Sequence, residues 1–154
     1  MKSVAVYYTY KVNSDSSNKD EDLKQIDLWC RKRNYNYTLY IDEVLNRNDN
    51  ENRLSMKELK RDIQRNYYSS VIIFNMHNLS RDFLFCTNFI NFARNYNCKV
   101  LSVDGVNLYS YTDFVEKLSK ALYKKNKEKV KKLKEEMERW IMKMKIEIQE
   151  IELN

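Results

Sequence analysis

The first hundred or so residues alternate short apolar runs with longer segments of helical periodicity. The apolar runs predict strands at residues 3–10, 37–41, 70–75 and 99–103. The segments between them predict helices at residues 20–34, 55–66 and 81–96. Because strands that alternate with helices form parallel sheets, the pattern predicts an α/β fold. We expect a mainly parallel sheet of four or five strands flanked by helices, with the apolar run at residues 71–74 as a central strand.

The carboxyl third of the chain has a different pattern. From about residue 111 to residue 151 a helical periodicity continues without a breaker, and we expect one long helix there. Apolar residues recur at Val130, Met137, Met144 and Ile151 on an otherwise charged helix. Such a stripe is typical of core packing or of contact between subunits. We therefore expect an α/β domain over residues 1–109 and a long amphipathic helix over residues 110–154.

The composition limits the class of protein. A chain of 154 residues with 43% hydrophobic residues suits one compact domain with its own core. A formal net charge of +6 and a pI near 9.1 favour a polyanionic partner without requiring one. The chain has one glycine and no proline, which excludes a glycine-rich dinucleotide loop and a phosphate-binding P-loop. We expect no cofactor.

The cysteines and the apolar segments indicate the cellular setting. Cys30, Cys86 and Cys98 are odd in number and lack the close paired spacing of metal or redox motifs, which favours reduced thiols and no metal site. No window approaches the roughly 20 apolar residues of a membrane span, and the first residues lack the apolar core of a signal peptide. We expect a cytoplasmic protein that does not enter membranes.

Polar segments follow the predicted strands at the points where those strands end. They are Lys11-Val12-Asn13-Ser14, Asp42-Glu43 and His77-Asn78-Leu79-Ser80-Arg81, with Arg53-Leu54-Ser55 at the start of the second helix. In an open α/β sheet, ligands bind outside the carboxyl ends of the strands. The sequence therefore predicts that these segments meet at one site. The alternative is that they are polar only because surface loops are polar in any protein.

These segments, at these spacings, resemble the active-site motifs of the resolvase and invertase family of serine site-specific recombinases. The resemblance covers nearly the whole chain. In that family the first strand ends in Arg-Val-Ser, and the serine hydroxyl attacks a DNA phosphodiester to form a covalent phosphoserine. Here Asn13 occupies the serine position, and an amide cannot become an oxygen nucleophile. Ser14 is a candidate shifted nucleophile, but it would point to the opposite face of the strand unless a bulge intervenes.

The resemblance also implies roles for the cationic residues. Arg53 matches the arginine that binds the scissile phosphate in the family, and with Lys11 and Arg81 it would grip that phosphate. The third segment resembles the family's Asp-Arg-Leu-Ser-Arg, with His77 in place of the aspartate and Asn78 in place of the first arginine. Loss of that arginine together with the serine implies impaired catalysis. His77 is a candidate general base, and the alternative is that it is a hydrogen-bonding loop residue.

In the family a long helix forms the dimer interface and crosses DNA toward a separate helix-turn-helix domain. This sequence ends where that domain would begin. The resemblance implies a homodimer formed through the carboxyl-terminal helix, with DNA as the partner and no helix-turn-helix domain in this chain. Candidate phosphate contacts are Lys124, Lys125, Lys127 and Lys131. These lysines could equally form a solvated helix face. Two hypotheses remain: a resolvase-like domain that binds DNA with weak or lost cleavage, and a non-catalytic protein-interaction module that oligomerises through its carboxyl-terminal helix.

Overall fold

The computed structural model describes residues 2–12, 16–46 and 49–153. The chain forms two compact units, which divide between Val103 and Asp104. Residue 109, where we expected the boundary, lies in a helix of the second unit. Within the described residues, no helix is long and apolar enough to cross a membrane.

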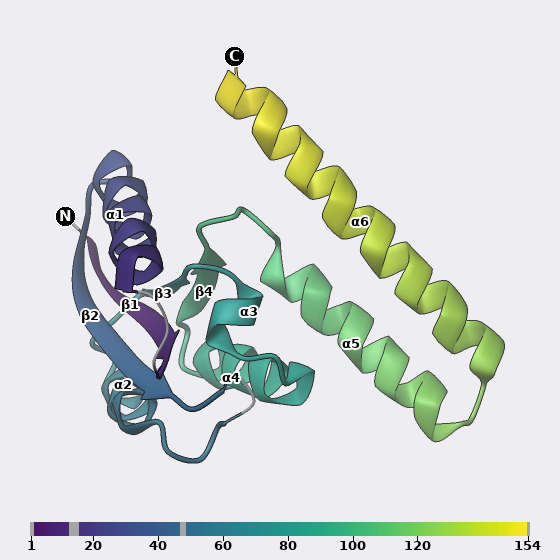
Figure 1. Ribbon diagram of the computed structural model, residues 1–154. Coiled ribbons are helices and arrows are strands. Elements are labelled where there is room, and N and C mark those ends of the chain that lie inside the picture. The colour runs from purple at the N-terminus through teal and green to yellow at the C-terminus, as the bar shows by residue number, and fades with distance from the viewer. Residues whose placement is uncertain (1, 13–15, 47–48, 154) are drawn as a thin grey trace. The chain divides into compact units, whose positions relative to one another are not determined.

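The first unit is a parallel sheet with helices on both faces, which confirms the predicted fold class (Figure 1). Its strands are β1 (Lys2–Lys11), β2 (Tyr35–Val44), β3 (Ser70–Ile73) and β4 (Lys99–Ser102), in the order β2-β1-β3-β4. Its helices are α1 (Ser16–Lys32), α2 (Leu54–Gln64), α3 (Met76–Leu79) and α4 (Phe83–Asn95). The short helix α3 has no counterpart among the predicted elements, because its four residues are too few to show a periodicity.

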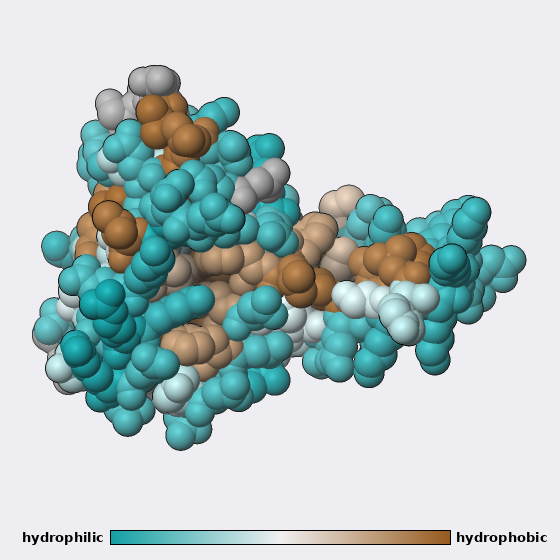
Figure 2. All heavy atoms as spheres, turned by 90° about the horizontal axis from the view of Figure 1, so that it is seen from below, coloured by the Kyte–Doolittle hydropathy of each residue, from teal (hydrophilic) through white to brown (hydrophobic). Residues whose placement is uncertain are grey.

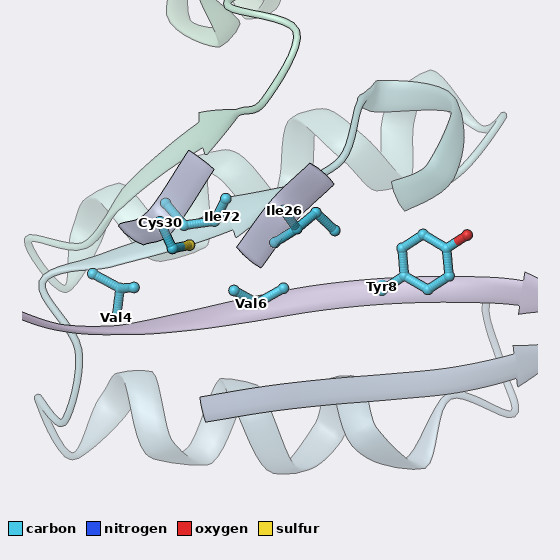
Figure 3. Packing of buried hydrophobic residues seen from close by; sticks show 6 residues of the cluster. All are labelled: Val4, Val6, Tyr8, Ile26, Cys30 and Ile72. Atoms are coloured by element: carbon cyan, nitrogen blue, oxygen red, sulfur yellow. The ribbon is translucent and has the colours of Figure 1, made fainter. Parts of the chain in front are cut away.

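The core forms where alternate side chains of the central strand β1 meet the helices. One face of β1 packs against α1 in a cluster shown in Figure 3: Val4, Val6, Tyr8, Ile26, Cys30 and Ile72. Helices α2 and α4 cover the opposite face (Figure 1). They lie side by side, since the Lys60 ammonium of α2 is 5.5 Å from the ring centre of Phe92 in α4. The two buried faces explain why β1 and β3 are apolar at successive positions.

Asparagine ends three of the helices in a chain with almost no glycine. Asn34, Asn66 and Asn97 follow α1, α2 and α4 with φ values of 57°, 61° and 57°. Glycine usually takes this left-handed position after a helix, and asparagine is the residue that tolerates it next best. These three helix ends are therefore built without glycine.

The second unit is a hairpin of two helices, α5 (Leu108–Tyr123) and α6 (Lys127–Leu153), which pack side by side (Figure 1). Their rings meet at Phe114 and Trp140, with centroids 5.9 Å apart. A long carboxyl-terminal helix is present as predicted, but the prediction that it runs unbroken from residue 111 is wrong. The stripe residue Val130 is half-buried in α6, and the side chains of Met144 and Ile151 lie outside the described residues.

The helix breaks because the backbone reverses at Lys125. This residue has a φ of 56°, and its N–H donates to Leu122 O at 3.0 Å while the Asn126 N–H donates to Ala121 O at 3.1 Å. This pair of bonds closes a helix in the Schellman motif. The Asn126 side chain then accepts a bond from Lys129 N at 3.1 Å and caps the start of α6. The sequence signal that was missed is Asn126, since no glycine or proline marks the turn.

Candidate functional site

The carboxyl ends of the strands lie at one edge of the sheet. Because the strands are parallel and Lys11 pairs in register with Val44, the loops after β1 and β2 leave from the same edge. The loop after β3 leaves from this edge as well, since β3 is parallel to β1. Hydrogen bonds join these loops to one another and to the strand ends.

Asp42, near the end of β2, fixes the start of α2. Its buried carboxylate accepts bonds from the backbone N–H groups of Ser55 at 2.8 Å and Met56 at 2.9 Å, and from the Tyr7 hydroxyl at 2.7 Å. The cap of this helix therefore comes from another strand rather than from the adjacent sequence. Burial, together with the bond to Asp42, raises the pKa of Tyr7 well above its ordinary value, and the nearby Arg53 charge opposes that rise.

Arg53 precedes α2 and lies inside the protein. Only 1% of its surface is exposed. Its Nε donates to Asp49 O at 2.9 Å, and its Nη1 donates to Leu79 O at the end of α3. The guanidinium carbon stands 4.7 Å from the centre of the Phe85 ring, a cation–π distance. In this arrangement the guanidinium binds carbonyl oxygens of the protein itself and joins the loop before α2 to the loop before α4.

Asn78 joins α3 to the end of β1. Its Oδ1 accepts a bond from Thr9 N at 3.0 Å, and its Nδ2 donates to Thr9 O at 2.9 Å. The Thr9 hydroxyl also donates to the Asn78 carbonyl. Strand β3 pairs with β1 only from Ala5 to Tyr7, so the Asn78 carboxamide continues the pairing of β1 where β3 has ended. Both residues are buried.

A second set of bonds joins the same two loops at Ser80. The Ser80 hydroxyl donates to Asn50 Oδ1 at 3.0 Å and accepts a bond from Asp82 N at 3.0 Å. Asn50 Nδ2 donates to Asp82 Oδ2 at 3.1 Å. Asp82 caps α4 by accepting bonds from Leu84 N and Phe85 N. The bonds among Asn50, Ser80 and Asp82 thus hold the loops after β2 and β3 together, in addition to the bonds made by Arg53.

The remaining candidate residues lie around this buried network. Lys11 and Arg81 are exposed, and each stands two residues beyond a member of the network, Thr9 and Leu79. His77 is exposed in α3. The candidate nucleophile positions, Asn13 and Ser14, lie outside the described residues.

The structure brings Arg53 and Asn78 into one hydrogen-bonded network and puts Lys11 and Arg81 at the same edge of the sheet. Reasoning from the sequence missed Tyr7, Thr9, Asn50 and Phe85 as parts of this network. Tyr7 carried a signal, because a tyrosine in a buried strand needs a partner for its hydroxyl. Within the described residues, no group of three or more His, Cys, Asp or Glu side chains is placed to hold a metal ion.

The four candidate DNA-contacting lysines belong to the second unit, and all are exposed. Lys124 and Lys125 form the turn between α5 and α6, while Lys127 and Lys131 lie in the first turns of α6. They therefore surround a helix reversal instead of lying along one straight helix. Few acidic side chains accompany them, the nearest being Glu128.

Comparisons with known proteins agree with this architecture. The family model described as Resolvase, N terminal domain, matches residues 9–147. The N-terminal catalytic domain of TP901-1 integrase is similar in structure, with a TM-score of 0.59 and 18% identity over 67% of this chain and 78% of that one. A resolvase family site-specific recombinase from Streptococcus pneumoniae gives a TM-score of 0.56 and 17% identity over 99% of this chain and 95% of that one.

A third similar structure is the C-terminal catalytic domain of ISC1926 TnpA, an IS607-like serine recombinase, with a TM-score of 0.58 and 11% identity. The match covers 88% of this chain and 96% of that one. At such low identities the structural matches show a shared fold. A search of curated protein sequences gave no match.

Proposed function

Because this chain belongs to the resolvase family of serine recombinases, we propose that it binds DNA and that its ability to cleave DNA is impaired. The observation that carries the proposal is the hydrogen bonding of the Asn78 side chain. This residue stands where the family has a catalytic arginine, and its carboxamide is bonded to both backbone groups of Thr9. A side chain that completes the pairing of a buried strand is not available to a phosphate.

The nucleophile position supports the same conclusion. Cleavage in the family forms a bond between the serine oxygen and phosphorus, while the oxygen of the broken strand leaves and takes up a proton. Asn13 has no hydroxyl to form that bond. Loss of a guanidinium that stabilises the charge on a transferring phosphoryl group costs on the order of 10³ in rate by analogy with arginine fingers. The two substitutions together would leave little cleavage.

The buried position of Arg53 also supports impaired cleavage. A phosphate would have to replace the carbonyl groups of Asp49 and Leu79 and to separate the guanidinium from the Phe85 ring. Removing a buried arginine from such partners costs several hydrogen bonds to a charged group, each worth about 1.5–3 kcal/mol. Lys11 and Arg81 remain exposed at this edge, where they provide positive charge.

The proposed DNA contact involves the exposed lysines at the turn between α5 and α6. Each lysine that neutralises a phosphate releases counterions, so binding would weaken steeply as salt rises. We further propose that the chain forms a homodimer through α6, whose heptad-spaced apolar residues suit a second helix. The same stripe favours the second candidate function, a protein-interaction module without a role on DNA.

Incubation with supercoiled plasmid DNA tests the proposal. We expect salt-sensitive binding, no covalent protein–DNA adduct and no nicked product. An adduct that disappears in Ser14→Ala would show cleavage through a shifted nucleophile and would refute the impairment. Absence of DNA binding at low salt, with self-association retained, would favour the protein-interaction module.

Restored variants separate the effects of the two lost residues, and an active recombinase run beside them is the positive control. Asn13→Ser returns the family nucleophile, and the double variant Asn13→Ser/Asn78→Arg also returns the arginine. We expect the single variant to remain inactive because the arginine is missing. If it cleaves as well as an active recombinase run beside it, the missing arginine does not limit cleavage.

A further inference from the structure

The turn between α5 and α6 carries an unusual combination of side chains. We define the hairpin tip as Leu122, Tyr123, Lys124, Lys125 and Lys127. Tyr123 is 90% exposed and Leu122 is 56% exposed. The face seen in Figure 2 is mostly hydrophilic, with apolar side chains gathered in several patches. An aromatic ring this exposed has gained no burial from folding, although burial is the usual reason for an aromatic side chain.

The backbone of the hairpin tip indicates that positive charge is retained there at a conformational cost. The described residues other than glycine with positive φ are Asn34, Asn66, Asn97 and Lys125. Three of the four are asparagine, which tolerates this conformation, whereas a lysine there is disfavoured by roughly 1–2 kcal/mol. The chain uses asparagine after α1, α2 and α4 but lysine after α5, which is the pattern expected if the charge at this position has a role.

Aromatic and cationic side chains together suit one class of ligand in particular. Proteins that bind single-stranded nucleic acid stack bases on aromatic rings and follow the backbone with positive charge. Protein–protein interfaces are also rich in tyrosine, but lysine is depleted from them. Lys124, Lys125 and Lys127 lie within four residues of Tyr123. The density of lysine around the exposed ring therefore favours a nucleic acid over a protein surface.

We infer that the hairpin tip is a binding site for unpaired nucleotides, in which Tyr123 stacks on a base and the adjacent lysines contact the flanking phosphates. The inference rests on the proposed function, since it names the form of DNA that the chain recognises through this unit. In a matched duplex each base is already stacked on its neighbours, so the ring gains little there. The tip consequently prefers single-stranded DNA or DNA with unpaired bases.

The test measures binding of the full chain to a labelled single-stranded oligonucleotide and to the matched duplex by fluorescence anisotropy. Tyr123→Ala should weaken single-strand binding on the order of tenfold, the loss expected for one stacked base, and should change duplex binding little. Tyr123→Phe should bind like the wild type because the ring face is kept. Tyr67→Ala removes another exposed tyrosine, on the first unit, and serves as the matched control.

Lys125→Asn tests the electrostatic part of the inference without disturbing the turn. Asparagine already occupies this backbone conformation at Asn34 and Asn97. We expect the variant to keep its helix content by circular dichroism. The slope of log affinity against log salt for single strands should fall by about 0.7, the value for one phosphate contact.

The outcomes separate this inference from the function on which it rests. If the wild type binds neither form of DNA at low salt, the proposed function fails and the inference fails with it. If DNA binding is intact and Tyr123→Ala leaves single-strand affinity unchanged, or weakens both forms equally, only the inference is overturned. Loss of self-association in Tyr123→Ala, with unchanged DNA affinity, would make the tip a protein interface and would also overturn it.

Discussion

Replacing Asn78 by alanine removes the side-chain connection between α3 and the end of β1, while the bond from the Thr9 hydroxyl to the backbone carbonyl of residue 78 can remain. The substitution deletes the bonds of 3.0 Å and 2.9 Å that the carboxamide makes with Thr9 N and Thr9 O. Both backbone groups lie on a residue with no exposed surface, so water cannot replace the lost partner without entering the core. The neighbouring pairing of Thr9 with Asp42 of β2 is unaffected.

The expected loss of stability follows from these two bonds. Each net hydrogen bond contributes about 1 kcal/mol, and a buried backbone group left without its partner costs about 1–3 kcal/mol. If local relaxation satisfies one of the two groups, the free energy of unfolding falls by roughly 2–4 kcal/mol. This is a large fraction of the total stability of a domain of this size, which is about 5–15 kcal/mol.

Urea unfolding followed by circular dichroism measures this loss, and amide exchange at Thr9 locates it. We expect a lower midpoint at unchanged slope and a loss of protection at the Thr9 amide. Asn91→Ala, an exposed asparagine on α4, is the matched control and should change stability by about 0.5 kcal/mol or less. A loss in Asn78→Ala no larger than in the control would refute the view that this side chain completes the pairing of β1.

Three further predictions concern other parts of the fold. Tyr7→Phe removes one of the donors to Asp42 and should lower the free energy of unfolding by about 1.5–3 kcal/mol in the same urea assay; an unchanged midpoint would contradict that bond. Lys125→Gly should raise thermal stability by about 0.5–1 kcal/mol, because glycine accepts positive φ but loses more backbone entropy; a lower melting temperature would contradict the turn. Burial raises the pKa of the Cys98 thiol to about 11, and burial, with the Asp27 charge, does the same for Cys30. The unfolded thiols therefore ionise first as pH rises from 9.0, and stability should fall between about pH 9 and 11; a urea midpoint independent of pH over that window would disagree.

The sequence was sufficient for the fold of the first unit. Its strands are short apolar runs bounded by polar loops, and each predicted strand has a counterpart in β1 to β4. The ends differ by a few residues, as with the run at residues 70–75, of which only Ser70–Ile73 is strand. Element ends depend on capping contacts more than on apolar pattern. The cap of α2 is an example, because it comes from Asp42, which is 13 residues earlier than Ser55.

The candidate site could be predicted in position but not in arrangement. The order of Lys11, Asp42, Arg53 and Asn78 along the chain predicted the edge of the sheet at which they lie, because parallel strands end together. The sequence did not reveal that Arg53 is buried, or that Asn78 is bonded to Thr9. Those contacts join residues 26 and 69 positions apart, and no local pattern encodes such a pairing.

The sequence by itself determined which segments become strands and helices in the first unit, that their polar ends share one edge, and that the chain is similar to the resolvases. Those properties follow from local periodicity, from the geometry of parallel sheets and from motif spacing. Only the tertiary structure decided that Arg53 faces the carbonyl groups of the protein, that Asn78 completes a strand, and that the carboxyl third turns back at Lys125. The first two depend on which distant groups come within hydrogen-bonding distance of a buried side chain when the chain packs. The third depends on a left-handed backbone conformation that lysine disfavours, so the local sequence does not predict it.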